Sequence, residues 1–370
     1  MSTPSKPQSA YTQGDAPANP HLPQHVQFGR TFRRWHVRGV WLRIDMRVFT
    51  MCLALVTLAV VIFIAALASG DYPLTVAQVW QALTSQAEEF TRTVVIEWRM
   101  PRALAACAFG TALGASGAIF QSLTRNPLAS PDILGFSAGA YTGALIVIIV
   151  LQGTYLDVAA GAFVGGIATA GLVYILAFRG GVQGFRLIIS GIAVSAMLSS
   201  LNTWLTLTAN LDTALVAAVW GAGSLNGMTW LQTGAGTVLV IILLAVTLGF
   251  TRPLKQLELG DDAAQALGVR VEPIRLVLML LSVALIAVVT AAAGPISFVA
   301  FAAPQIARRI TRSPGVSVAA SACMGAVLLS ASDYVALHAL PAMLPVGTVT
   351  VVLGGGYLIW LLIAEARKRG

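Results

Sequence analysis

Few side chains in this sequence have the type and spacing that catalysis or metal binding requires. Three of the four histidines lie within the first 36 residues, and the three cysteines, Cys52, Cys107 and Cys323, lie singly within apolar runs. Cysteines placed in this way behave as small buried hydrophobic residues, so we expect neither a disulfide nor a metal centre. The sequence contains no HExxH motif and no phosphate-binding loop of the form GxxxxGKS or GxxxxGKT. We therefore expect no catalytic residue, no metal and no cofactor in this chain, and ATP hydrolysis would have to occur on a partner.

Two polar stretches interrupt the apolar chain and are the best candidates for function. Residues 125–131 read RNPLASP, and the two prolines end the preceding helix and force a compact, extended connection. Residues 251–275 contain two adjacent acids, Asp261 and Asp262, which suit the start of a helix. A helix of two turns is not stable alone, so it needs a surface to pack against. We predict a docking element here, and the alternative is an ordinary helix in a surface loop.

Small residues recur at helical spacing on both sides of the first polar stretch. They are Gly110, Gly114 and Gly117 before it, and Gly135, Gly139 and Gly143 after it. There is little hydrophobic force between helices in lipid, and small residues allow the close backbone contact that holds helices together. Residues 99–143 therefore predict two tightly packed helices joined by a stiff polar turn.

The composition places the chain in a membrane. Of the 370 residues 57% are hydrophobic and 10% are charged, and the mean hydropathy is +0.80. A soluble domain carries about 25% charged residues. The net charge of +8 could indicate a nucleic-acid partner, but the basic residues gather at the ends of apolar runs, as topology signals do. We predict a multi-pass membrane protein with no nucleic-acid partner.

Ten apolar runs are candidates for membrane spans, each of which needs about 20 residues. They are residues 48–68, 101–122, 132–152, 157–178, 187–208, 231–250, 276–294, 296–310, 316–337 and 346–364. If both termini are cytoplasmic, 20 of the 23 Lys and Arg residues lie on the cytoplasmic side, as the positive-inside rule requires. Only Arg92, Arg99 and Arg102 then lie outside. The expected fold is all-α with ten transmembrane helices.

Residues 1–47 differ from the rest of the chain. Prolines punctuate a polar stretch that cannot bury apolar surface, so we expect disorder. The stretch becomes basic just before the first apolar run, which suits a cytoplasmic anchor better than a cleaved signal peptide. We divide the chain into a disordered basic tail, residues 1–47, and a transmembrane domain, residues 48–370.

Three stretches together resemble the FecCD-type permeases, which are the membrane subunits of ABC importers for iron–siderophore complexes, haem and vitamin B12. They are residues 99–139, LGDDAAQALGV at 259–269 and AGPISFVAFAAPQIARR at 293–309. The likeness covers about residues 48–370 and is greatest to permeases for ferric enterobactin. It implies the type II ABC importer permease fold in the inner or plasma membrane. The implied cargo is an intact ferric siderophore, of the catecholate class.

The resemblance also implies roles for particular residues. Asn126, Pro127 and Leu128 correspond to a cytoplasmic gate. Arg99, and Arg102 beside it, correspond to charges that dock the extracytoplasmic binding protein; the alternative is interfacial snorkelling. The element that couples to the ATPase would comprise Leu259, Gly260, Asp261, Asp262, Ala263, Ala264, Leu267 and Gly268.

The implied partners are a second FecCD-type permease subunit, expected to be a different chain, two ATP-binding cassette subunits, a siderophore-binding protein and membrane lipid. ATP and Mg would bind only to the ATPase. Gln305 replaces the family's usual His after Pro304, so we assign it no role. Asp333 lies within an apolar run; an intramembrane acid is a functional candidate, but a structural carboxylate with a partner is the favoured interpretation.

Two other functions remain open from the residues. One is a haem or vitamin B12 permease within the same family. The other is an ion-coupled secondary transporter, which would use intramembrane carboxylates or broken helices near the midplane. The central apolar runs contain almost no acids, which argues against the secondary transporter.

Overall fold

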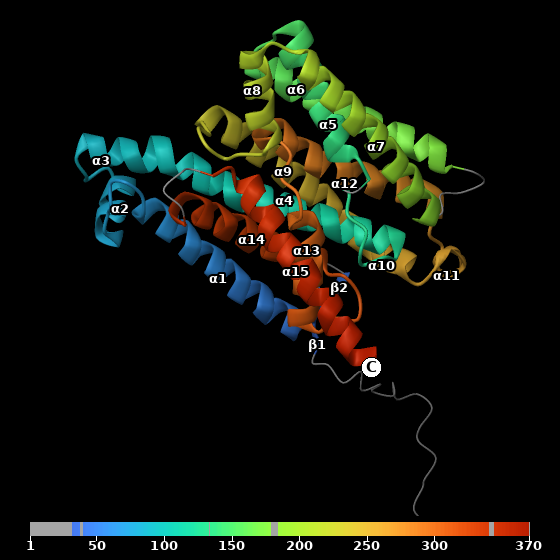
Figure 1. Ribbon diagram of the computed structural model, residues 1–370. Helices are drawn as coiled ribbons and strands as arrows, with labels where there is room; N and C mark the ends of the chain where they lie inside the picture. The colour runs from blue at the N-terminus through green and yellow to red at the C-terminus, as the bar shows by residue number, and fades with distance from the viewer. Residues whose placement is uncertain (1–31, 38–39, 133, 179–183, 340–343, 370) are drawn as a thin grey trace, which may run out of the picture. The chain divides into compact units, whose positions relative to one another are not determined.

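The structure is a computed structural model that describes residues 32–37, 40–132, 134–178, 184–339 and 344–369 (Figure 1). The chain divides into two compact units, residues 1–46 and residues 47–370. The division falls next to the boundary expected at residue 47.

The described part of the first unit is a β-hairpin. Strand β1 (Phe32–Val37) pairs antiparallel with β2 (Val40–Asp45). This corrects the expectation of disorder for these residues. Aromatic and β-branched residues recur in both strands, and they favour strands even beside a proline-rich stretch. Residues 1–31 of the expected tail lie outside the described residues.

The described residues of the second unit form helices joined by short connections. Seven helical segments are long and apolar enough to cross a membrane. Six of them are α1 (Met46–Ala68), α6 (Tyr155–Ala177), α7 (Gly184–Thr208), α9 (Trp230–Gly249), α12 (Val271–Ala293) and α14 (Val318–His338). The seventh is continuous through α3 (Glu89–Thr93), the π-helix η1 (Val94–Arg99) and α4 (Met100–Thr124). The prediction of a helical, multi-pass membrane protein is confirmed.

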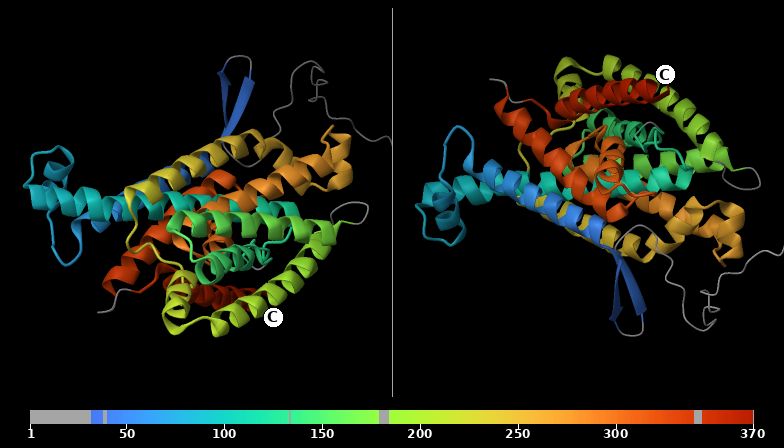
Figure 2. Two further views of the ribbon diagram at one scale, coloured as in Figure 1. Left: turned by 90° about the horizontal axis from the view of Figure 1, so that it is seen from above. Right: turned by 90° about the horizontal axis from the view of Figure 1, so that it is seen from below.

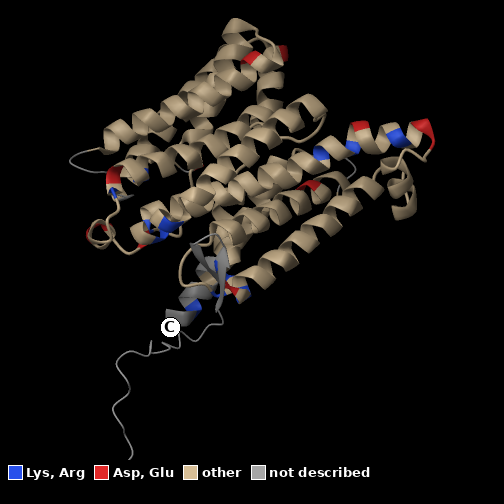
Figure 3. Ribbon diagram, turned by 180° about the vertical axis from the view of Figure 1, so that it is seen from behind, with Lys and Arg blue, Asp and Glu red and all other residues tan. Residues whose placement is uncertain are grey.

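The remaining helices are shorter or end in residues whose side chains are not described. They are α2 (Val76–Leu83), α5 (Phe136–Leu145) with the π-helix η2 (Ile146–Leu151), α8 (Leu211–Gly221), α10 (Thr251–Glu258), α11 (Asp261–Ala266), α13 (Val299–Thr311) and α15 (Val346–Arg369). Charged residues gather near the ends of the long helices, and the ribbon between them is mostly uncharged (Figure 3).

Helix α4 lies in the middle of the helical unit (Figure 2) and packs against α14, α13, α12 and α9. It is enclosed on most sides, because 18 of its 25 residues are buried. Polar side chains within this core bond one another or backbone carbonyl oxygens. The Ser116 and Ser282 hydroxyls lie 2.9 Å apart between α4 and α12.

The glycines of α4 bring its backbone against its neighbours. A Cβ atom at Gly114 would collide with the carbonyl oxygen of Ser321 on α14, and one at Gly117 would collide with the carbonyl oxygen of Ala300 on α13. Gly110 meets α14 in the same way, and Gly139 and Gly143 bring α5 against α6. Gly135 differs from the expectation, because it precedes α5 as its N-cap with φ +83° and is not part of the helix.

We expect Gly114→Ala to destabilise the protein by about 1–3 kcal/mol, because the added methyl group has no space between α4 and α14. The measurement is thermal unfolding of the detergent-solubilised protein. Gly234→Ala on α9 is the matched control, since nothing lies within 4 Å of the Cβ it would add. Equal unfolding temperatures for the two variants would contradict the packing role of Gly114.

Candidate functional site

The polar turn after α4 is folded by its own side chains. Arg125 ends the helix in the left-handed conformation with φ +50°. The Asn126 Oδ1 atom then accepts the backbone N–H of Leu128 at 2.9 Å, and the Asn126 carbonyl accepts that of Ala129 at 3.1 Å. These local bonds fix a tight turn. Leu128 remains 51% exposed at its tip.

Two buried glutamines hold this turn from inside the bundle. The Gln305 Nε2 atom on α13 donates to the carbonyl oxygen of Pro127 and to Gln121 Oε1, the latter at 3.1 Å. The Gln121 Nε2 atom in turn donates to the carbonyl oxygen of Phe301 at 3.1 Å. We assigned Gln305 no role from the sequence, whereas the structure shows its side chain bonded to the turn. A buried amide in an apolar helix needs a partner, and that signal could have identified Gln305.

Helix α11 and the residues beside it are mostly exposed, whereas α10 buries Leu254 and Leu257. Ala264 is fully buried, while Leu259 and Leu267 are 67% and 56% exposed. Asp262 and Ala263 are also exposed. Ala263, Ala264 and Leu267 therefore differ in burial, and α11 ends at Ala266.

Glycines frame α11 on both sides. Gly260 precedes the helix with φ +115°, and Gly268 follows it with φ +82°. A residue with a Cβ atom rarely adopts either conformation, so glycine suits both ends of this short helix.

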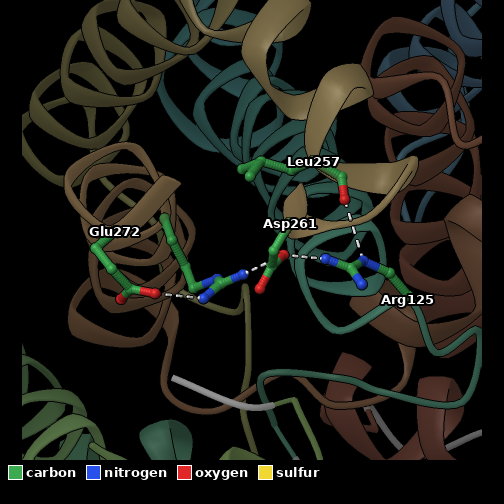
Figure 4. A network of polar contacts seen from close by, with 5 residues as sticks. Arg125, Leu257, Asp261 and Glu272 are labelled. Atoms are coloured by element: carbon green, nitrogen blue, oxygen red, sulfur yellow. Dashed lines mark hydrogen bonds and ion pairs between the residues drawn. The ribbon is translucent and has the colours of Figure 1, made fainter. Parts of the chain in front are cut away.

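Asp261 joins the two polar stretches (Figure 4). Its Oδ1 atom accepts hydrogen bonds from Arg125, at the end of α4, and from Arg275 Nη2 on α12 at 2.7 Å. The Arg125 Nε atom also donates to the carbonyl oxygen of Leu257 on α10 at 3.1 Å. Arg275 completes the network by donating to Glu272 at 2.8 Å. We call Arg125, Asp261 and Arg275 the junction.

A second polar contact joins the same elements. The Ser122 hydroxyl of α4 donates to Glu258 Oε1 of α10 at 2.6 Å. The end of α4 is therefore held to the α10–α11 segment by two separate carboxylates, those of Glu258 and Asp261. With the bond from Arg125 to the Leu257 carbonyl, these contacts should make the turn follow any movement of that segment.

The charge on Asp261 is stable at physiological pH. Partial burial alone would raise the pKa of this carboxyl, but the guanidinium groups of Arg275 and Arg125 outweigh that effect and lower the pKa. A carboxyl whose pKa is lowered on folding contributes stability above its ordinary pKa of about 3.9 and loses it as the pH falls through the lower, folded value. The junction should therefore be insensitive to pH near neutrality.

The arginines expected to dock a binding protein make internal contacts. Arg99 Nη1 donates to the carbonyl oxygen of Leu67 at 2.8 Å, and Arg99 Nη2 donates to that of Tyr72 at 2.7 Å. Arg99 is half-buried and holds the end of α1, so it differs from the free charge that we expected.

Arg102 has a carboxylate partner inside the bundle. It donates to both oxygens of Asp333 on α14 at 2.8–3.2 Å, and the two side chains are 13% and 4% exposed. Arg102 therefore has a structural partner, and its role in docking a binding protein stays a prediction. The same contact supplies the partner that the favoured interpretation of Asp333 required.

The model of the FecCD transport family matches residues 58–364. The chain belongs to the FecCD transport family. This confirms the resemblance in the sequence. Members of the family are inner-membrane permease subunits of ABC importers, in which ATP hydrolysis occurs on a partner.

Individual relatives cover most of the chain. The ferric enterobactin transport system permease protein FepG of Escherichia coli (strain K12) is 50% identical over 88% of this chain and 99% of its own length. The achromobactin transport system permease protein CbrC of Dickeya dadantii (strain 3937) is 37% identical over 83% of this chain and 89% of its own. The iron(3+)-hydroxamate import system permease protein FhuG of Bacillus subtilis (strain 168) is 36% identical over 83% and 94%.

One solved structure shares the fold. It is an inward-facing metal-chelate type ABC transporter, with a TM-score of 0.75 and 24% identity, and the match covers 85% of this chain and 99% of that chain. The helical arrangement described here is therefore that of an ABC transporter permease.

Proposed function

We propose that this chain is the permease subunit of an ABC importer that carries an intact ferric siderophore of the catecholate class into the cytoplasm. The 50% identity to FepG, over 99% of that protein, carries the proposal. Relatives named for achromobactin and for iron(3+)-hydroxamate are 36–37% identical, so mixed and hydroxamate siderophores are the next candidates.

The same proposal includes ten membrane spans with both termini in the cytoplasm. The seven long segments, together with α5–η2, α13 and α15, would make the ten. This orientation puts 20 of the 23 Lys and Arg residues on the cytoplasmic side, as the positive-inside rule favours. The partners would be a second FecCD-type permease, two ATP-binding subunits and a siderophore-binding protein, and this chain would need no cofactor.

We infer that the α10–α11 segment and residues 126–128 move as one cytoplasmic unit. The exposed residues Leu259, Asp262, Ala263 and Leu267 would contact the ATPase. The junction then transmits a displacement of α11 to Arg125, the residue directly before the gate turn. The exposed Leu128 would close the translocation path against its counterpart on the second permease. The two contacts from Asp261 and Glu258 support this role.

Uptake by the reconstituted importer tests the substrate. The chain would be assembled in proteoliposomes with its ATPase, second permease and binding protein, and offered radioiron bound to enterobactin, a hydroxamate or citrate, or labelled haem or vitamin B12. We expect uptake of the catecholate complex that requires ATP. Preference for another chelate would overturn the substrate class, and uptake driven by an ion gradient without ATP would overturn the ABC importer itself.

Asp262→Lys should weaken binding of the ATPase without disturbing the junction. The Asp262 side chain is exposed and makes no hydrogen bond that is described, so its charge is free to meet a partner. Reversing a rim charge replaces attraction with repulsion, and the effect should shrink as salt rises. The measurement is co-purification of the ATPase at low and high salt. Asp212→Lys, which changes an exposed acid at the start of α8, is the control, and equal recovery with both variants would remove Asp262 from the docking surface.

A further inference from the structure

A pocket of about 490 Å³ lies between α5, α7 and the residues that precede α13. Side chains with hydroxyl or amide groups make up much of its lining. They are Ser137, Tyr141, Ser199, Asn202, Thr203, Thr206 and Ser297. None of the contacts that define the junction reaches this pocket, so it is a separate feature of the molecule.

Four of these side chains form one stripe on α7. Ser199, Asn202, Thr203 and Thr206 follow the helical spacing i, i+3, i+4 and i+7, which places them on one face. Helix α7 lies at the margin of the helical unit (Figure 2), and most of its residues are not buried. The stripe is therefore a polar strip on an otherwise apolar, mostly exposed helix.

Asn202 bonds two residues of α5 and has one side-chain N–H group left over. Its Oδ1 atom accepts from the Thr142 hydroxyl at 2.6 Å, and its Nδ2 atom donates to the carbonyl oxygen of Ala138 at 3.2 Å. The side-chain amide has two N–H groups, so one remains without a partner among the described residues. Asn202 is only 6% exposed, and a buried donor without a partner is unfavourable.

The hydroxyl groups supply both donors and acceptors. The Thr203 and Thr206 hydroxyls donate to carbonyl oxygens of their own helix at 2.9 Å and 2.8 Å, so they can offer only lone pairs to a ligand. The Ser199 and Ser297 hydroxyls have no partner in the part of the chain that the structure describes. They are free to donate. If they faced lipid, the Ser199 and Ser297 hydroxyls would lack hydrogen-bond partners, so this surface suits a water-filled path.

The pocket lacks a free charge. No Lys or Arg is among the described residues that line it, and its one carboxylate, Asp132, accepts from Ser137 at 3.0 Å and Ser130 at 3.4 Å. Such a lining has no cation to pair with an anionic chelate, so it would hold one through hydrogen bonds alone. Its free N–H and O–H donors suit the amide and iron-bound oxygen atoms of a chelate, which they would hold weakly enough to release, as transport requires.

We propose that this pocket is a transit site where oxygen atoms of the organic chelate accept hydrogen bonds from Ser199, Asn202 and Ser297. The proposal rests on the proposed function, because it assumes that an organic iron chelate crosses this protein. It adds the part of the path that the chelate contacts and the chemistry of that contact.

Thiol labelling tests whether the pocket belongs to a water-filled path. Ser199→Cys and Thr203→Cys would each be made in a chain whose three native cysteines are replaced by alanine, and assembled with its partners in nanodiscs. We expect both thiols to react with a water-soluble thiosulfonate, and ATP with binding protein loaded with ferric enterobactin to slow the reaction several-fold. Ser200→Cys is the control, because Ser200 is exposed on α7 but does not line the pocket. Unreactive pocket thiols, or reaction unaffected by the chelate, would overturn the transit site.

Uptake kinetics separate this proposal from the function on which it rests. Loss of one hydrogen bond changes binding by about 3- to 10-fold, so Ser199→Ala and Ser297→Ala should each raise the KM for ferric enterobactin by that factor. Ser200→Ala should leave both the KM and the ATPase activity unchanged. If the wild-type importer does not carry ferric enterobactin, the proposed substrate fails. If it does, and both pocket variants match wild type, only the transit site is overturned.

Discussion

Arg125→Gln is expected to uncouple ATP hydrolysis from transport. The substitution removes the charge that holds the gate turn to Asp261, and with it the bond to the Leu257 carbonyl. We expect chelate transported per ATP hydrolysed to fall by about 10-fold, within the 0.5–2 kcal/mol by which residues between two sites change their coupling. ATPase activity of the complex should remain close to that of wild type. Both rates are measured on the same proteoliposomes.

A double-mutant cycle decides whether the loss of coupling arises from the contact between Arg125 and Asp261. If Arg125 acts through Asp261, then Arg125→Gln with Asp261→Asn should be no worse than either change alone. Lys255→Gln is the control, because it removes an exposed cation from the same segment. Additive losses, or a fall in ATPase activity that matches the fall in uptake, would show that the junction serves assembly and does not couple the two events.

Asp333→Ala is expected to prevent stable folding. It leaves the guanidinium of Arg102, which is 13% exposed, without its partner inside the bundle. Breaking a buried pair by removing one charge costs about 3–5 kcal/mol. That loss would remove much of the stability of an ordinary domain. The measurement is the yield of monodisperse protein and its unfolding temperature.

Removing both charges should restore the fold. Replacing a buried pair by apolar residues is often neutral or stabilising, so Arg102→Leu with Asp333→Leu should recover most of the yield. The recovered protein also separates two roles for Arg102. A structural arginine predicts normal association with the binding protein, whereas a docking charge predicts weaker association. Wild-type stability of Asp333→Ala would contradict the structural role.

Periodicity and local chemistry were sufficient to locate the long helices and both polar stretches, but not the shorter helices α8 and α10. The spacing of Gly110 and Gly114 indicated a packing face, since a face depends only on neighbours along the helix. The same reasoning could not identify partners. Arg102 and Asp333 are separated by 231 positions, and Gln121 and Gln305 by 184, so no local pattern connects them.

The junction shows the same limit within residues that were singled out. Asp261 was interpreted as a helix-start residue that faces a partner, yet its carboxylate bonds Arg125 and Arg275 of the same chain, which the fold brings to it. The β-hairpin was missed for a different reason. The prolines of residues 1–31 dominated the composition of the tail, and the strand-forming residues after them were averaged with it.

The most direct test of the account is the distance between the gate turn and α11 within one chain. Spin labels would be placed at Leu128 and Gln265, both exposed, and in a second sample at Leu128 and its counterpart on the second permease. If the junction makes the turn and α11 one unit, the first distance stays constant between the nucleotide-free and ATP-bound states while the second changes. A first distance that changes as much as the second would contradict the account.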